Sequence, residues 1–148
     1  MERIVIKFIE RPDFNDPEKI LKWFCDVFGL SSDGEPNSIE EQILRNFTEA
    51  AYSSNKGLSS SELRLNTQLA RSTVIYHLNR FRDAGLLVKK GRKYYLRASE
   101  MRKAIEEIEY DINREMQRML DMAGEFDKLM EVAMDKRQKG HRRQARQK

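Results

Sequence analysis

The apolar residues of one strongly basic segment, residues 71–97, change their spacing halfway along it. Val74, Leu78 and Phe81 recur at steps of four and three, a spacing that predicts the buried face of a helix. Two short apolar runs follow, separated by a basic stretch that contains Gly91, and this order is typical of a two-stranded hairpin. The segment therefore predicts a helix followed directly by a hairpin.

Two capping boxes predict further helices before this segment. Ser38 is followed by Glu41, and Ser59 by Glu62, so that each serine can accept a hydrogen bond from the main chain of a new helix. The second helix is expected to be short and to end near Thr67. Helix, short helix, turn, helix and hairpin is the order of a winged helix-turn-helix, which we expect over residues 38–97. The predicted fold class is mainly α with a small β-hairpin.

The N-terminal part, residues 1–37, predicts a strand and an apolar helix. Residues 3–9 alternate weakly and are rich in β-branched side chains, which favours a strand. An Asp-Pro pair then opens a helix that runs to about residue 28. Its apolar residues cover most of its circumference, so we expect Trp23 and Phe24 to support the core or a dimer contact. An effector pocket beside this helix is the less favoured alternative.

The net charge of +4 conceals an alternating pattern. Residues 71–97 carry eight Lys and Arg and one Asp, and residues 136–148 carry seven basic residues and no acidic one. Residues 1–70 and 98–135 are net acidic. A basic island on an acidic body is typical of a nucleic-acid-binding protein. A solvated charged face is the alternative, and for residues 136–148 the two remain equally open.

The predicted helix and hairpin would present polar and basic side chains together. The face opposite the apolar stripe fits the major groove of double-stranded DNA, and basic residues at the hairpin tip suit the phosphates beside it. The predicted DNA-binding residues are Arg71, Ser72, Thr73, Tyr76, His77, Asn79, Arg80, Lys89, Lys90, Arg92 and Lys93.

The stretch "STVIYHLNRFRDAGLL", followed by a charged hairpin, resembles the winged-helix domain of ArsR-type transcriptional regulators, especially archaeal ones. The resemblance covers about residues 39–97. It implies that the helix over residues 71–84 reads DNA, that the hairpin is the wing, and that flanking helices form a homodimer. Gln68 and Ala70 depart from the usual Gly and Ser or Thr before that helix, which either weakens its cap by ~1 kcal/mol or shifts the helix start to Ser72. The cysteine pairs of the metal-sensing members are absent.

Residues 98–135 predict a long amphipathic helix. With position a at Ile105, nine of the ten a and d positions are apolar and Glu115 is the exception. A helix packed on its own domain would show such a stripe over only two or three turns, so a coiled-coil-like homodimer is favoured. Residues 136–148 are expected to form a basic disordered tail. The predicted dimerisation residues of this helix are Met101, Ile105, Ile108, Ile112, Met119, Met122, Phe126 and Leu129.

Residues that could carry catalysis or bind a metal are few. Cys25, His77 and His141 are scattered, and no phosphate-binding glycine loop or nucleophile–base set is evident. We therefore expect no enzyme activity, no cofactor and no metal. The single cysteine agrees with a cytoplasmic location. No apolar run is long enough to span a membrane.

The function predicted from the sequence is sequence-specific binding of double-stranded DNA by a homodimer that regulates transcription. A winged helix used as a protein-interaction module in a larger assembly is the alternative, since the fold alone does not decide. A binder of single strands or RNA is less favoured, because few aromatic residues are available for stacking. The operator, any small-molecule effector, and the choice between repression and activation are not predicted.

Overall fold

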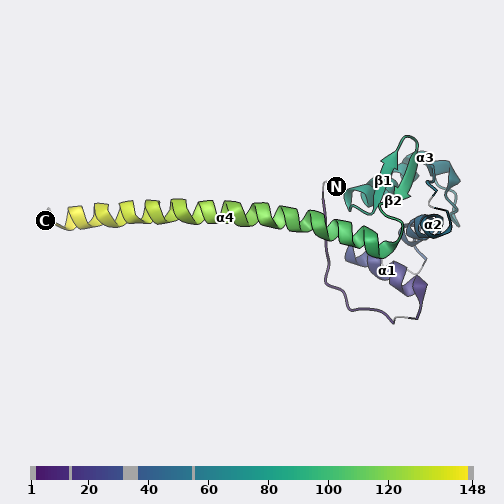
Figure 1. Cartoon of the computed structure of the whole chain (residues 1–148), viewed down its shortest axis with the longest axis horizontal. Coiled ribbons are helices and arrows are strands. Elements are labelled where there is room, and N and C mark those ends of the chain that lie inside the picture. Colours follow the sequence, from purple (N-terminus) through teal and green to yellow (C-terminus); the bar gives the residue numbers. More distant parts are fainter. Residues whose placement is uncertain (1–2, 14, 32–36, 55, 147–148) are drawn as a thin grey trace. The chain divides into compact units, whose positions relative to one another are not determined.

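The computed structural model describes residues 3–13, 15–31, 37–54 and 56–146 (Figure 1). It forms two compact units, Met1–Ile108 and Glu109–Lys148. The chain is mainly helical with one antiparallel hairpin and a long C-terminal helix, as the sequence predicted. The elements are α1 (Pro17–Val27), α2 (Ile39–Ser53), the single 3-10 turn η1 (Ser60–Glu62), α3 (Arg71–Asp83), β1 (Leu87–Lys90), β2 (Lys93–Leu96) and α4 (Met101–Arg146).

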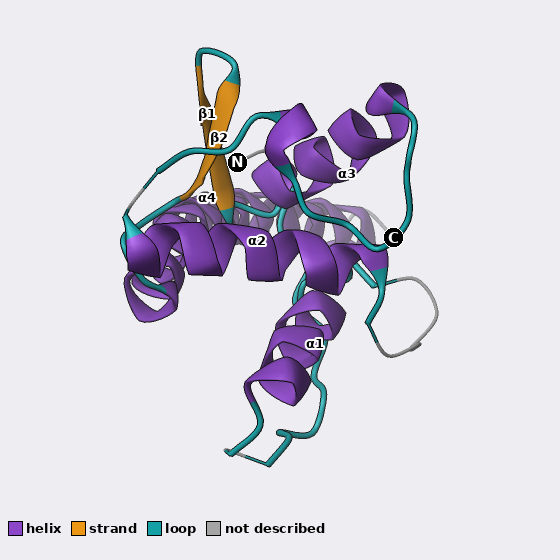
Figure 2. Cartoon of the chain, turned by 90° about the vertical axis from the view of Figure 1, so that its right-hand side faces the viewer, coloured by secondary structure: helices purple, strands orange, loops and turns teal. Residues whose placement is uncertain are grey.

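The core of the first unit forms around α2. Figures 1 and 2 show α1 on one side of this helix, and α3 with the hairpin on the other. Because α2 is covered from both sides, even polar residues of its first turn, such as Glu40 and Gln42, are buried. The largest fully buried side chains are Phe47, Phe81, Ile43, Leu44, Leu78, Leu86 and Cys25.

The predicted start and end of α1 are confirmed. The Asp16 carboxylate accepts a hydrogen bond from the Glu18 N–H (3.0 Å), and Pro17 occupies the first helical position, where no donor is needed. Gly29 follows the helix with φ of 66°, a left-handed conformation that glycine adopts without strain.

The predicted strand over residues 3–9 is wrong for the single chain. These residues have no regular secondary structure, and their side chains are exposed apart from Ile4, which is half-buried. Two main-chain hydrogen bonds hold them, from Arg3 to Asp83 (3.4 Å) and from Lys7 to Val27 (2.7 Å). Both acceptors are the last residues of helices, so within the described residues no neighbouring strand is present to form a ladder.

The second capped helix is shorter than predicted. Its capping box is present, with the Ser59 N–H donating to the Glu62 carboxylate (3.0 Å), but only the 3-10 turn η1 follows. The chain is extended at Leu63 and reaches α3 without a further helix. Side chains of α2 bind the main chain of residues 64 and 66, and these bonds compete with helix formation.

The predicted hairpin is confirmed. β1 and β2 pair with Leu87 opposite Leu96 and Lys90 opposite Lys93, and Gly91 in the turn has φ of 63°. Leu58 adds a one-residue bridge on the other side of β2, exchanging two main-chain hydrogen bonds with Tyr94, each 2.8 Å long. This bridge ties the segment before η1 to the hairpin.

Helix α4 begins within the first unit, where Ala104 and Ile108 are buried. Its first main-chain N–H, that of Met101, donates to the Tyr52 hydroxyl of α2 (3.3 Å). The helix continues to Arg146, whereas the sequence predicted a disordered tail from residue 136. Residues 136–146 are mostly Lys, Arg and Gln, which have high helix propensity, so a helix already formed can extend through them.

Candidate nucleic-acid interface

The first half of α3 exposes polar side chains on one face. Val74, Leu78 and Phe81 are buried against the core, as their spacing predicted. The opposite face is open to solvent and mixes one cation with hydroxyl, amide and phenol groups. Its exposed members are Arg71, Ser72, Thr73, Tyr76 and Asn79.

The N-terminus of α3 has no side-chain cap. Ala70 occupies the N-cap position in an extended conformation and offers no acceptor to the first turn. The Thr73 N–H bonds the Ala70 carbonyl oxygen (3.0 Å), so the N–H groups of Arg71 and Ser72 are those that lack a side-chain cap. A helix N-terminus of this kind carries partial positive charge and suits a phosphate oxygen.

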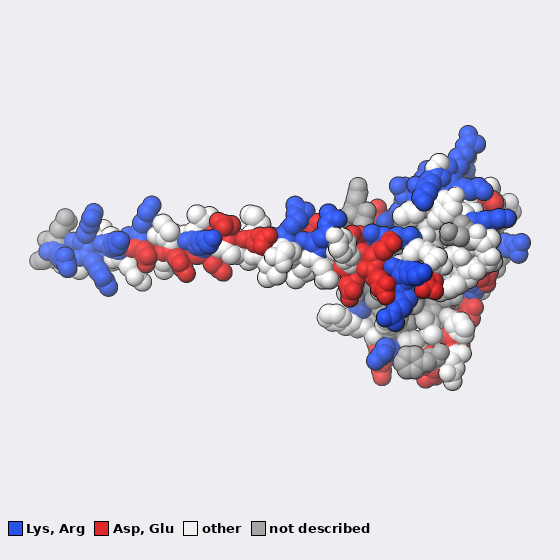
Figure 3. Space-filling view, viewed as in Figure 1, with Lys and Arg blue, Asp and Glu red and all other residues white. Residues whose placement is uncertain are grey.

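The hairpin tip is basic on both strands. Lys89, Lys90, Arg92 and Lys93 are all exposed, and residues 84–99 contain no acidic residue. The Nζ atoms of Lys89 and Lys90 lie 5.5 Å from the ring centroids of the tyrosines across the ladder, which orders their aliphatic stems. Figure 3 shows Lys and Arg gathered over the part of the first unit that holds the hairpin and α3.

Two of the predicted DNA-binding residues, His77 and Arg80, face the body of the first unit instead of solvent. The Arg80 guanidinium donates to the Gly29 carbonyl oxygen (3.0 Å) and lies 3.7 Å from the Glu40 carboxylate. His77 Nδ1 also lies 3.7 Å from Glu40. The two residues are three positions apart, so they share the flank of α3 that contacts α2. This spacing of three was the signal in the sequence that His77 and Arg80 both face the same neighbouring helix.

Two amide side chains of α2 fix the segment that leads into α3. Asn46 accepts from the Arg64 N–H (2.9 Å) and donates to the Arg64 carbonyl oxygen (3.0 Å). Gln42 accepts from the Asn66 N–H (2.8 Å) and donates to the Asn66 side chain (2.9 Å). The sequence analysis missed both residues, although their spacing of four on one helix face was a signal. They set where α3 begins relative to α2.

Gly57 is a second residue that the sequence analysis missed. A Cβ atom at this position would lie 2.4 Å from the ring of Tyr95 on β2, closer than side chains approach each other. Glycine therefore allows the Tyr95 ring to pack on the main chain just before the Leu58 bridge. The hairpin is held on this side by main-chain contact.

Three titratable groups in this unit have clear pKa shifts, each with a structural cause. The hydrogen bond to Asp26 raises the pKa of the Lys22 ammonium group. Burial raises the pKa of the Cys25 thiol, which therefore stays protonated and unreactive at neutral pH. The hydrogen bonds from Ser59 lower the pKa of the Glu62 carboxyl, and the charge of Lys93 on the hairpin adds to this effect. Glu62 therefore stays ionised near the hairpin and supports η1.

The predicted dimerisation residues fall into three groups. Ile108 is buried within the first unit, while Met101, Ile105 and Ile112 are half-buried. Trp23 and Phe24 are also half-buried, with ring centroids 5.2 Å apart, and the Trp23 Nε1 donates to the Ile9 carbonyl oxygen (3.1 Å). The remaining four are from 60% to 69% exposed: Met119, Met122, Phe126 and Leu129.

Neither a metal site nor a membrane span occurs in the described part of the chain. No three His, Cys, Asp or Glu side chains there are grouped so that they could hold a metal ion, and none of its helices is long and apolar enough to cross a membrane. Compared with known proteins, the chain matches no family model, no curated protein and no solved structure. A functional assignment therefore depends on the geometry of α3 and the hairpin.

Proposed function

We propose that residues 38–97 form a winged helix-turn-helix that binds double-stranded DNA, and that the protein regulates transcription as a homodimer. The observation that carries the proposal is the exposure of the α3 polar face together with the basic tip of the adjoining hairpin. α3 would enter the major groove, and the hairpin, as the wing, would lie along the flanking phosphates.

The residues divide by the contact that they would make. Tyr76 and Asn79 are exposed on the groove-facing side of α3 and would reach base edges. Arg71, with the uncapped first turn, would bind a phosphate, as would the four basic residues of the hairpin tip. Arg80, which bonds the Gly29 carbonyl oxygen, would hold α3 on the core instead of reading bases.

The homodimer would form along the exposed apolar face of α4. Glu115, which interrupts the heptad, is exposed and bonded to Arg118 (2.9 Å), and Met116 continues the face at steps of four and three between Ile112 and Met119. A second copy of the same helix has the matching stripe and would cover it. Two copies would then present two recognition helices to the two halves of a symmetric site.

The test is selection of binding sequences from a random double-stranded library, followed by titration of a selected site and of random DNA at a stated salt concentration. We expect a two-fold symmetric consensus and binding to it at least ~10³-fold tighter than to random DNA. Equal affinity for both DNAs would contradict sequence-specific recognition. No binding to either at low salt would contradict the whole proposal.

One observation favours a protein-interaction module as the second candidate. With Arg80 turned inward, the exposed basic residues of α3 lie only at its two ends, Arg71 and Arg82, and the exposed Tyr76 between them is typical of protein contacts. In that case substitutions in the hairpin tip would leave partner binding unchanged. The DNA titration separates the two candidates.

A further inference from the structure

The N-terminal segment, residues 3–10, leaves apolar side chains uncovered. Val5, Ile6 and Ile9 are exposed, and Phe8 is fully exposed (101%). Because burial of apolar surface is favourable, a fully exposed ring among exposed β-branched residues is typical of a surface that another molecule covers.

One edge of this segment is already bonded to the first unit. The N–H groups of Arg3 and Lys7 donate to the last residues of α3 (3.4 Å) and α1 (2.7 Å), and the Ile9 carbonyl oxygen accepts from the α1 tryptophan (3.1 Å). All three residues have odd numbers. In an extended chain, alternate residues direct their main-chain groups to opposite edges, so the odd residues face the body of the unit.

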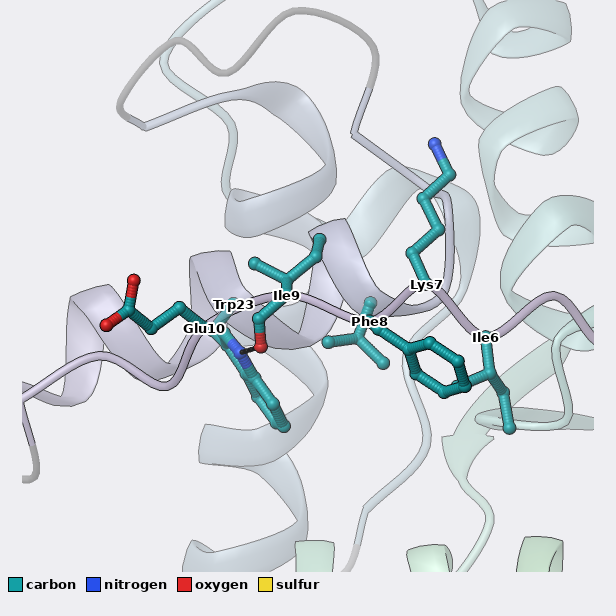
Figure 4. Close-up of a pocket in the computed structure, with 7 residues that line it drawn as sticks. Ile6, Lys7, Phe8, Ile9, Glu10 and Trp23 are labelled. Carbon is teal, nitrogen blue, oxygen red and sulfur yellow. Dashed lines mark hydrogen bonds between the residues drawn. The ribbon is translucent and has the colours of Figure 1, made fainter.

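The other edge is free. Among the described residues, the main-chain groups of Ile4, Ile6 and Phe8 have no hydrogen-bond partner. Figure 4 shows the side chains alternating as in a strand, with Lys7 and Ile9 on one side of the trace and Ile6 and Phe8 on the other. An extended, β-branched edge with unpaired donors and acceptors is a template for another strand.

We infer that this edge pairs antiparallel with the same segment of a second copy. In an antiparallel pair, two residues opposite each other direct their main-chain N–H and C=O groups either both toward the partner strand or both away from it. Because the even-numbered residues direct these groups to the free edge, even-numbered residues must lie opposite even-numbered ones. The centred register places Ile6 opposite the partner's Ile6 and Ile4 opposite the partner's Phe8. It forms about six main-chain hydrogen bonds and stacks six apolar side chains on one face.

Within residues 3–9, charge favours this register over its two neighbours. A shift in one direction places Arg3 opposite the partner's Lys7, and a shift in the other places Lys7 opposite the partner's Lys7. Like charges directly opposite each other are destabilising. In the centred register Arg3 lies opposite the partner's Ile9, and Lys7 opposite the partner's Val5. The pairing is self-complementary, as a two-fold symmetric contact requires.

Disulfide formation in the full-length chain tests the pairing. Ile6→Cys would bring two thiols together at a Cα separation of about 5.5 Å, which a disulfide spans, whereas Lys7→Cys would separate them by more than about 7 Å. Under mild oxidation, we expect I6C to form covalent dimers at least about five times faster than K7C. Wild-type protein is the blank, because Cys25 is buried.

Two results would overturn the inference. One is cross-linking of K7C as fast as I6C, and the other is no cross-linking of I6C at any protein concentration. Amide hydrogen exchange of the unmodified chain gives a second readout, in which protection of Ile4, Ile6 and Phe8 should increase with protein concentration. The controls are Phe8→Glu, which should abolish this concentration dependence, and Lys7→Glu, which should keep it. These measurements involve no DNA, so they fail or succeed independently of the proposed function.

Discussion

Arg80 is the residue whose role changes most between sequence and structure. Its guanidinium bonds the Gly29 carbonyl oxygen and lies beside the buried Glu40 carboxylate, so it links α3 to the end of α1 and to α2. Removing it would leave Glu40 without this cation in a buried position. Tyr76, one turn earlier, is 60% exposed, and its ring centroid lies 5.9 Å from the Arg80 guanidinium on the same helix.

We therefore predict opposite effects for these two neighbours. Arg80→Ala should lower the free energy of unfolding by about 1–3 kcal/mol, and Tyr76→Ala should change it by less than about 0.5 kcal/mol. Affinity for a selected DNA site should fall by about 1–3 kcal/mol in Tyr76→Ala. Urea unfolding and DNA titration of both variants measure this. A Tyr76→Ala protein that binds its site normally would remove Tyr76 from the interface.

Gly57 leads to a second prediction at the residue scale. Gly57→Ala should lower the free energy of unfolding by about 1–3 kcal/mol, because the new Cβ would displace the Tyr95 ring. A double-mutant cycle with Tyr95→Ala checks the cause. With the ring removed, the added Cβ should cost less than about 0.5 kcal/mol. An unchanged penalty would mean that the main chain at Gly57, and not the ring, resists substitution.

At the scale of the element, the position of α3 depends on side chains of α2. Asn46 and Gln42 together satisfy main-chain groups of the segment before α3 that would otherwise lack partners. Because these bonds replace helical ones, η1 stays a single turn and α3 starts at Arg71.

Asn46→Ala should therefore lower the free energy of unfolding by about 0.5–1.5 kcal/mol, since it removes both side-chain hydrogen bonds to the exposed main chain of Arg64. Glu49→Ala, at an exposed position of the same helix, is the matched control and should cost less than about 0.5 kcal/mol. Urea unfolding followed by circular dichroism measures both. Equal effects would show that the Asn46 hydrogen bonds contribute nothing beyond helix propensity.

The elements that the sequence predicted are those with local causes. The Asp-Pro pair sets the start of α1, and the change of apolar spacing in residues 71–97 sets α3 and the hairpin. The errors have non-local causes. Residues 3–9 have strand composition but no partner strand among the described residues, and Arg80 turns toward a carboxylate that belongs to another helix. The spacing of apolar residues along the sequence does not reveal contacts between segments that lie far apart in the chain.

At the scale of the whole molecule, the apolar face of α4 defines the assembly. Replacing Ile108 would destabilise the first unit, because its side chain is only 2% exposed there. Met119 and Phe126 lie beyond that unit and are exposed, so they test association separately from folding.

The double variant Met119→Asp, Phe126→Asp should associate far more weakly than wild type, with only the pairing of residues 3–9 left, while the first unit keeps its stability, because two carboxylates per chain would have to be desolvated in the seam. Gln117→Asp with Lys128→Gln, on the opposite face of α4, also changes the charge by −2 and should remain dimeric. Light scattering at micromolar concentration distinguishes them. A wild-type protein that is already monomeric there would refute the dimer.

The basic end of α4 concerns DNA affinity rather than assembly. Ending the chain after Asp135 removes seven basic residues and changes the net charge from +4 to −3. If these residues bind phosphates, affinity for all DNA sequences should fall and the salt dependence should flatten, by about 0.9 in the log–log slope for each phosphate that is no longer neutralised.

The control keeps the length, with Lys136, Arg137 and Lys139 changed to Gln, and its slope should flatten by no more than three such steps. DNA titration from low to physiological salt measures the slopes. Identical slopes for wild type and truncated chain would mean that the positive charge of residues 136–148 stays in solvent, and that the hairpin and α3 supply the whole electrostatic contribution.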